Sequence, residues 1–134
     1  MGSEEVIRAL FDAFTRRDLD GALALTHPDL EFWPQGTAQR AARQEPYRGH
    51  DGLREYFADV ARHWDELRVE PGELRVAGDG VVAFGTAVGR PPGAEEDVSQ
   101  PVIWLFKLRE GRVLHGRVVA TAAEALAAAE RSNW

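Results

Sequence analysis

Side chains that could carry acid–base or nucleophilic chemistry are few in this chain. The sequence has no cysteine, which excludes thiol catalysis and cysteine-bound zinc. Its serines lie at a terminus, near a loop and at a helix end, and none follows the strand-to-helix turn that exposes a nucleophile. The four histidines stand apart from one another rather than at the spacings of metal ligands. We therefore expect no metal and no cofactor.

Three residues remain as candidates for a catalytic acid or base: His63, Tyr56 and Glu31. Imidazole titrates near neutral pH, which makes His63 the first choice among the histidines. Glu31 alternates with Leu30 and Phe32 in a short apolar run, and alternate residues of a strand point to opposite faces. If Phe32 faces an apolar interior, Glu31 faces away from it, toward solvent or a second subunit.

Aromatic side chains are more informative than these polar candidates, and the chain has four tryptophans. A buried indole usually needs an acceptor for its N–H, so several tryptophans in a small chain favour rings at the edge of a pocket. The alternative, that the rings pack as core, stays open, and we prefer it for Phe57 and Phe84. The aromatic side chains predicted to bind a ligand are Phe14, Trp33, Tyr56, Trp64 and Trp104.

Helical periodicity dominates the first half of the chain, which must position these groups. Apolar residues recur every three or four positions in a first helix that Ser3 is expected to cap and in a third that starts at Asp51. Asp18 is the expected cap of a short second helix, which ends near Thr26 because Pro28 follows.

Between the second and third of these helices, residues 30–33 form a short apolar and aromatic run that indicates a strand. Residues 35–48 form a long connection, within which residues 38–43 are compatible with a helical turn. Connections of this length often cover a functional site.

From Leu67 onward the apolar period changes to two, which indicates consecutive strands. The phase of this alternation reverses at Pro71-Gly72, as it does at a β-bulge, and a bulge bends its strand. Further strands are predicted over 81–88, 98–108 and 112–120. Thr121 and Glu124 form a capping box for a last helix that ends near Ser132. Helices early and strands late predict an α+β fold with a curved antiparallel sheet.

Length and charge limit the class of protein. A chain of 134 residues corresponds to one domain, 1–134. A net charge of −6 gives little attraction to nucleic acid or to an anionic membrane. No apolar run is long enough to span a membrane. The absence of cysteine and of a signal-peptide pattern leads us to expect a cytoplasmic protein.

Three stretches together resemble a known family. They read FDAFTRRDLDGAL at 11–23, YRGHDGLREYF at 47–57, and EGRV at 110–113 followed by AEAL at 123–126. Their order and spacing resemble the nuclear transport factor two-like superfamily, in its SnoaL-like (polyketide-cyclase-like) branch. The resemblance implies a cone-shaped roll: a strongly bent sheet, helices that close its mouth, a central apolar pocket and a homodimer.

The resemblance also tests the chemistry position by position. It places Leu10, Pro34 and Trp104 where ketosteroid isomerases carry a tyrosine donor, a carboxylate base and a protonated acid. SnoaL-like cyclases use an acid–base carboxylate at the position of Trp104. Related epoxide hydrolases use a carboxylate–arginine–carboxylate set, of which only Arg117 remains in the late strands. None of these three activities is therefore expected.

The same resemblance assigns faces in the last strand. Gly116, Val118 and Ala120 form a small-residue face that lines the pocket, which makes Val118 a predicted ligand-binding residue, and Arg117 points to the other side. Trp104, at a position that is polar in relatives, is the best single pocket residue.

Three readings remain open. The first is a domain that binds a small apolar or aromatic ligand. The second is a cyclase, dehydratase or hydrolase type of enzyme with a non-standard acid or base. The third is a dimerisation module without a ligand.

Overall fold

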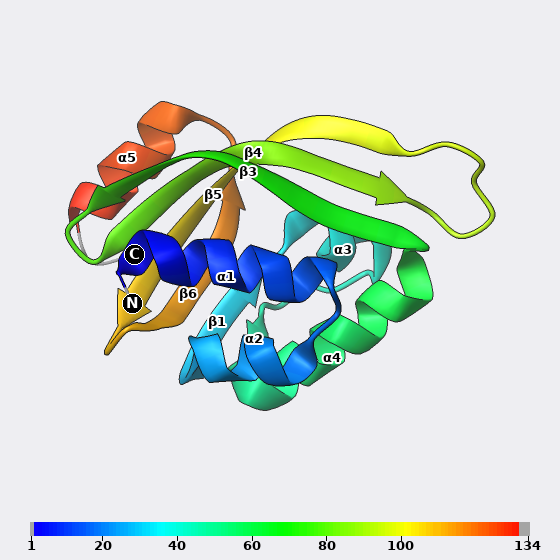
Figure 1. Cartoon of the computed structure of the whole chain (residues 1–134), viewed down its shortest axis with the longest axis horizontal. Coiled ribbons are helices and arrows are strands. Elements are labelled where there is room, and N and C mark those ends of the chain that lie inside the picture. The colour runs from blue at the N-terminus through cyan, green and yellow to red at the C-terminus, as the bar shows by residue number, and fades with distance from the viewer. Residues whose placement is uncertain (1, 132–134) are drawn as a thin grey trace.

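The computed structural model describes residues 2–131. Within them, helices pack on both faces of a single sheet (Figure 1). The α+β class predicted from the sequence is confirmed. The helices are α1 (Ser3–Thr15), α2 (Leu19–Leu25), α3 (Gln35–Arg40), α4 (Gly49–His63) and α5 (Ala122–Arg131). The strands are β1 (Thr26–Trp33), β2 (Tyr47–Arg48), β3 (Glu66–Ala77), β4 (Gly80–Arg90), β5 (Val98–Arg109) and β6 (Arg112–Val119).

The strands form one open, bent sheet in the order β2-β1-β6-β5-β4-β3. The register of β3 against β4 shifts between Pro71 and Leu74, which confirms the predicted bulge. The prediction of a wholly antiparallel sheet is wrong at one pair, since β1 and β6 run parallel. No hairpin joins these two strands. Four strands and two helices lie between β1 and β6 in the chain. No tight turn therefore fixes the relative direction of β1 and β6.

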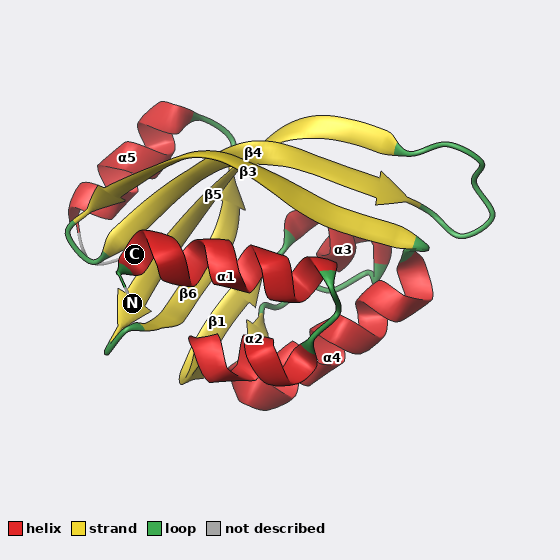
Figure 2. Cartoon of the chain, in the orientation of Figure 1, coloured by secondary structure: helices red, strands yellow, loops and turns green. Residues whose placement is uncertain are grey.

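Helices cover the two faces of the sheet unequally (Figure 2). The larger core lies on the concave face, where α1, α2 and α4 bury residues such as Ile7, Leu10, Leu53 and Phe106. A smaller core lies on the opposite face, where the alanines of α5 pack on Val82 and Leu105 and leave β1 and β2 uncovered. Helices α1 and α4 each bury one apolar stripe, as their periodicity predicts.

The ends of α1 and α2 differ partly from expectation. Ser3 is not the N-cap of α1, because the helix already includes it and Gly2 occupies that position without a side-chain bond. Asp18 is the N-cap of α2, as predicted, and its carboxylate accepts a hydrogen bond from the Gly21 N–H at 3.0 Å. The expected cap Asp51 lies inside α4, which begins at Gly49.

At the other end of the chain, Thr121 Oγ1 accepts from the Glu124 N–H at 3.1 Å, which confirms that Thr121 caps α5. The predicted end of this helix at Ser132 lies outside the described residues.

The connection over 35–48 is more ordered than its length suggested. Pro34 occupies the N-cap position of α3, with extended backbone angles, and the helix buries Thr37 and Ala38. The helix is therefore displaced from the turn expected over 38–43. The two residues of β2 then pair with β1, opposite Glu31 and Phe32. A strand this short leaves no alternation in the sequence that could reveal it.

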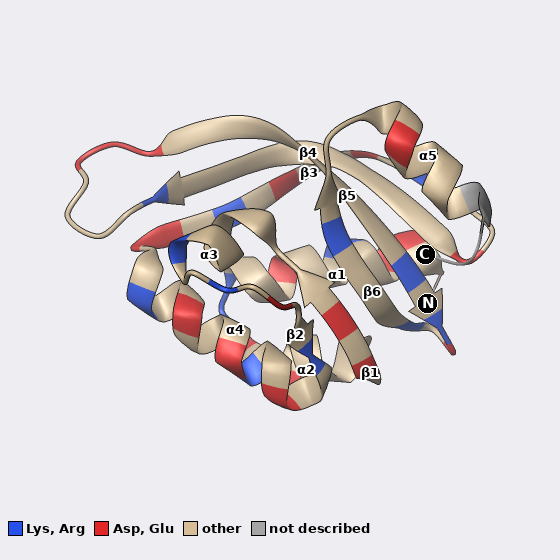
Figure 3. Ribbon diagram, turned by 180° about the vertical axis from the view of Figure 1, so that it is seen from behind, with Lys and Arg blue, Asp and Glu red and all other residues tan. Residues whose placement is uncertain are grey.

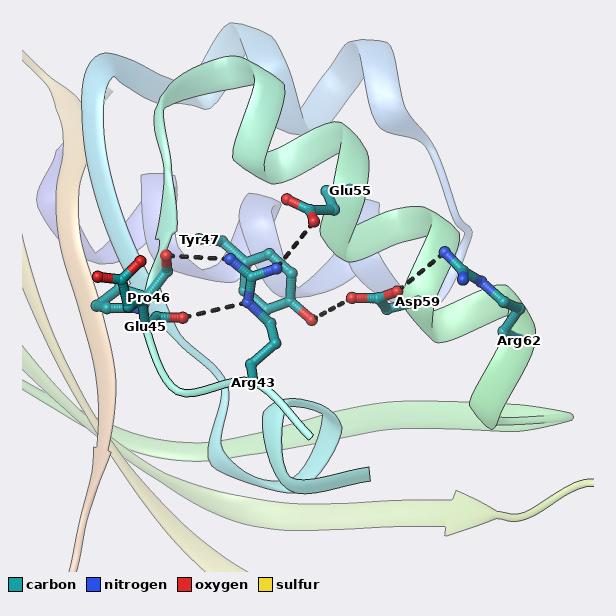
Figure 4. A network of polar contacts seen from close by, with 7 residues as sticks. All are labelled: Arg43, Glu45, Pro46, Tyr47, Glu55, Asp59 and Arg62. Atoms are coloured by element: carbon teal, nitrogen blue, oxygen red, sulfur yellow. Dashed lines mark hydrogen bonds and ion pairs between the residues drawn. The ribbon is translucent and has the colours of Figure 1, made fainter. Parts of the chain in front are cut away.

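A polar network fastens this segment to α4 (Figure 4). The Arg43 guanidinium donates to the backbone oxygens of Glu45 and Pro46, both at 3.2 Å, and pairs with Glu55 at 2.9 Å. It also lies 3.8 Å from the centre of the Tyr47 ring. Charge-assisted bonds of this kind are stronger than neutral ones, so Arg43 holds the loop that carries α3.

The Tyr47 hydroxyl continues the network into the interior. It donates to Asp59 Oδ2 at 2.7 Å, and Asp59 pairs through its other oxygen with Arg62 at 3.1 Å. Burial, together with the bond to Asp59, raises the pKa of Tyr47 well above its usual range. The phenol therefore stays protonated and keeps satisfying the carboxylate that α4 buries.

Candidate ligand-binding cavity

A cavity of about 510 Å³ opens between the helices and the concave face of the sheet. Side chains of α1, α3 and α4 border it on one side, and side chains of β3, β4, β5 and β6 border it on the other. Its volume lies within the range of pockets that hold drug-sized molecules.

Six aromatic side chains contribute to the apolar wall. Phe14 lies 5.4 Å from Tyr56 and 5.8 Å from Phe57, ring centre to ring centre, in edge-to-face contacts. Trp104 stacks on Phe32 at 5.6 Å. These contacts pack the rings of the lining against one another in favoured edge-to-face and stacked arrangements.

A small polar cluster interrupts this wall. The Trp64 Nε1–H donates to Thr37 Oγ1 at 3.1 Å, and Tyr56 borders the cavity beside them. Burial raises the pKa of Tyr56 above its usual range, although Thr37 and Arg17 act on it in the opposite direction. At neutral pH the phenol is therefore protonated and able to donate a hydrogen bond.

The charged side chains in the lining are all cationic. Arg17 and Arg68 border the cavity, and no aspartate, glutamate or histidine does so among the described residues. Arg17 Nη2 donates to the backbone oxygen of Trp64 at 3.1 Å, and Arg68 pairs with Glu66 at 3.6 Å on the same strand.

Most of the ligand-binding residues predicted from the sequence border this cavity. They are Phe14, Tyr56, Trp64, Trp104 and Val118. Trp33 does not border it. Its neighbour Phe32 is 1% exposed and packs in the inner core, so strand alternation turns Trp33 to the outer face. There it borders a second hollow of about 140 Å³ together with Glu31 and Arg117.

The three candidates for acid–base catalysis lie apart. Tyr56 alone borders the cavity. His63 is the last residue of α4 and lies outside the lining, because the backbone becomes extended at Trp64 and the indole takes the cavity side. Glu31 lies on the outer face, where its carboxylate pairs with Arg48 and with His115 Nδ1, the latter at 3.3 Å.

The outer-face placement of Glu31 and Arg117 follows the alternation read from the sequence, since Phe32 and Val118 face inward. His115 lies beside Glu31 on this face. Burial lowers the pKa of His115, against the opposing influence of Glu31, and nearby cations such as Lys107 lower it further.

The resemblance placed Leu10, Pro34 and Trp104 at the catalytic positions of ketosteroid isomerases, and all three are apolar or aromatic side chains. Leu10 is 1% exposed in the core, while Pro34 and Trp104 border the cavity. The buried Trp104 Nε1–H has no hydrogen-bond acceptor among residues 2–131. In the same part of the chain, no three histidine, aspartate or glutamate side chains gather as they would around a metal ion.

Thr37 and Arg17 are two lining residues that the sequence analysis did not single out. Thr37 lies in the segment interpreted as a long connection, and no sequence pattern links it to Trp64. The signal available for Arg17 was its position directly before Asp18, where a helix ends and the chain must reverse.

Solved structures with the same fold cover nearly the whole chain. TerC, co-crystallised with polyporic acid, is 26% identical over 97% of this chain and 98% of its own, with a TM-score of 0.77. A nuclear transport factor two-like protein of unknown function from Burkholderia pseudomallei is 25% identical over 95% and 97%, with a TM-score of 0.78. IdmH from Streptomyces antibioticus, a proposed polyketide cyclase, is 20% identical over 95% and 97%, with a TM-score of 0.72.

No curated protein sequence matches the chain. None of the described helices has the length and apolar character needed to cross a membrane. The model of the SnoaL-like domain matches residues 7–116, which run from within α1 to within β6. The bent sheet, the helices on its concave face and this match agree, and the chain belongs to the SnoaL-like domain family.

Proposed function

We propose that this protein binds a small, largely apolar molecule with a flat or aromatic body in the cavity beneath α1, α3 and α4. The observation that carries this proposal is a space of about 510 Å³ bordered by six aromatic side chains, including Phe14, Trp64 and Trp104. Apolar, concave sites with a few polar groups are typical of ligand pockets. The likeness to TerC, whose structure contains polyporic acid, supports the same conclusion.

Quenching of tryptophan fluorescence tests this proposal, because Trp64 and Trp104 both border the cavity. Flavone, 2-naphthamide and progesterone represent planar, compact and steroid-shaped neutral molecules. We expect at least one of them to quench with a micromolar dissociation constant. Val118→Phe, which enlarges a side chain in the lining, should weaken this binding about tenfold, equivalent to about 1.4 kcal/mol.

The matched control is Val76→Phe, because Val76 is 54% exposed on β3 and lies outside the lining. It should leave binding unchanged. Ala61→Trp, at an exposed position of the lining, provides a second obstruction if Val118→Phe does not fold. Equal binding by wild type and both obstructed variants would show that the ligand binds elsewhere, and absence of quenching by all three molecules would contradict the proposal.

A second candidate function is acid-assisted enolisation of a bound ketone by Tyr56. It is favoured by one observation: Tyr56 borders the cavity, and burial keeps its hydroxyl protonated. A donor positioned on a carbonyl oxygen stabilises the enolate that forms when solvent removes an α-proton.

Exchange of the α-protons of 2-tetralone in D₂O, followed by NMR, tests this activity. We expect the wild type to exceed the buffer rate and Tyr56→Phe to lose about 10²-fold of that excess, as for removal of one oxyanion donor. Exchange at the buffer rate, or an unchanged rate in Tyr56→Phe, would exclude Tyr56 as the acid.

We also propose that two copies of the chain pair through the outer face of β1, β2 and β6. Support comes from the part of this face that α5 leaves uncovered, where Trp33 and Arg117 border the second hollow. Sedimentation velocity should give the mass of a dimer for the wild type and of a monomer for Trp33→Glu. A monomeric wild type would contradict the pairing, and would also argue against a dimerisation module as the function of the chain.

A further inference from the structure

Arg17 has an unusual backbone conformation for its residue type. It follows the C-cap of α1 with φ 54°, in the left-handed region that glycine adopts most easily. Its N–H bonds to Phe14 O at 3.1 Å and the next N–H bonds to Ala13 O at 2.8 Å, the pattern of a Schellman motif. Glycine is the usual residue here, so Arg17 holds a left-handed backbone conformation that is strained for a residue with a side chain.

The Arg17 side chain is turned to the cavity rather than to a carboxylate. It borders the cavity and donates to the backbone oxygen of Trp64, also in the lining. No carboxylate oxygen lies within 4 Å of its guanidinium among the side chains that the structure describes. Its neighbour Arg16, by contrast, pairs with Asp12 at 2.9 Å and with Asp18 at 3.7 Å.

The rest of the lining adds no negative charge. Arg68 is its second charged residue and is partly neutralised by Glu66, while Gln35, Gln39 and Gln100 supply amide groups at the exposed rim. A chain with a net charge of −6 thus surrounds a cavity whose charged groups are all cationic. Arg17 is an exposed residue of this lining and Arg68 is partly buried, so solvent reaches both cations. Their charges still favour an anion in this concave site.

We propose that the molecule bound in this cavity carries an anionic oxygen group, such as a carboxylate or an ionised enol, beside its aromatic body, and that Arg17 binds that group. The guanidinium uses one of its N–H groups on Trp64, which leaves others able to reach a carboxylate. This inference rests on the proposed binding function and specifies the chemical class of ligand for the same cavity.

The test compares 2-naphthoate with 2-naphthamide, two molecules of nearly equal shape that differ in charge, by isothermal titration calorimetry at pH 7.5. We expect naphthoate to bind about tenfold more tightly to the wild type, as one charge-assisted hydrogen bond predicts. Added salt should weaken the binding of naphthoate and leave that of naphthamide nearly constant.

Arg17→Gln should remove most of the preference for naphthoate while changing the binding of naphthamide less than about twofold. Arg16→Gln is the matched control, since it changes the net charge equally one residue away from the lining. It should retain the preference. Arg68→Gln should have a smaller effect than Arg17→Gln, because Glu66 already pairs with Arg68.

Arg17→Gly separates binding from structure. Glycine fits the left-handed backbone, so this variant should unfold at a temperature no lower than the wild type and still lose the preference for naphthoate. A lower unfolding temperature, together with equal loss of both probes, would show that Arg17 is only a structural residue.

The possible failures are distinguishable. If naphthamide binds as tightly as naphthoate, the anionic ligand is excluded while the proposed binding function stands. If neither probe binds at millimolar concentration, this inference fails, and the quenching test with flavone and progesterone decides the proposed binding function separately.

Discussion

The two tyrosines of this chain are both buried, and their hydroxyl groups serve different parts of the molecule. Tyr47 donates to Asp59 in the network between β2 and α4. Tyr56 borders the cavity. Burial raises the pKa of both, so both remain protonated at neutral pH. The first therefore stabilises the fold, and the second supplies a donor to the proposed site.

Tyr47→Phe should lower the free energy of unfolding by about 1–3 kcal/mol, because it leaves a buried carboxylate without one of its hydrogen bonds. Asp59 is only 7% exposed, so water cannot easily replace the lost donor. Urea unfolding followed by circular dichroism measures the change. A loss below about 0.5 kcal/mol would place this bond among the minor surface contacts of the protein.

His115 should make stability depend on pH. Because its pKa is lowered in the folded protein, the unfolded chain binds a proton at higher pH than the folded one. The contribution of neutral His115 is therefore complete above about pH 6.5 and is lost as the pH falls below that value. Between pH 8 and pH 5, wild type should lose more unfolding free energy than His115→Gln; equal losses would contradict the assignment.

At the scale of elements, the sequence predicts the features that depend on residues close together in the chain. The stripes of α1 and α4, the bulge of β3 and the cap Asp18 all follow from residues close in sequence. The parallel pairing of β1 with β6 does not, because it joins segments about 85 residues apart and no hairpin defines it. The outer-face position of Trp33 could have been predicted. The same strand alternation that placed Glu31 on the outer face places Trp33 there too.

Two glycines of the cavity wall should respond oppositely to substitution by alanine. Gly36 lies in α3 with no atom within 4 Å of an added Cβ, so Gly36→Ala should raise the free energy of unfolding by about 0.5–1 kcal/mol. At Gly89 an added Cβ would stand 2.5 Å from Trp64 Cζ3, so Gly89→Ala should lower it by about 1–3 kcal/mol.

Urea unfolding of both variants measures these changes, and the emission of Trp64 should shift only in Gly89→Ala. A stabilising Gly89→Ala would mean that the indole moves away without cost and that the contact between β4 and Trp64 does not shape the cavity.

At the scale of the whole molecule, charge is distributed differently outside and inside. Acidic and basic residues are interspersed over α4 and over the rear of the sheet (Figure 3). The described lining of the cavity has cationic and apolar groups but no acidic ones. The sequence predicted the apolar walls through its aromatic residues. It could not predict this charge, because Arg17 and Arg68 are 51 positions apart and border one cavity only in the folded chain.

A crystal structure of the protein soaked with 2-naphthoate tests the central claim most directly, that the cavity beneath α1, α3 and α4 binds a small aromatic molecule. We expect electron density for the naphthalene ring against Phe14, Trp64 and Trp104, with the carboxylate at the Arg17 guanidinium. A ring bound on another surface, or a cavity closed by the side chain of Trp104, would contradict the account.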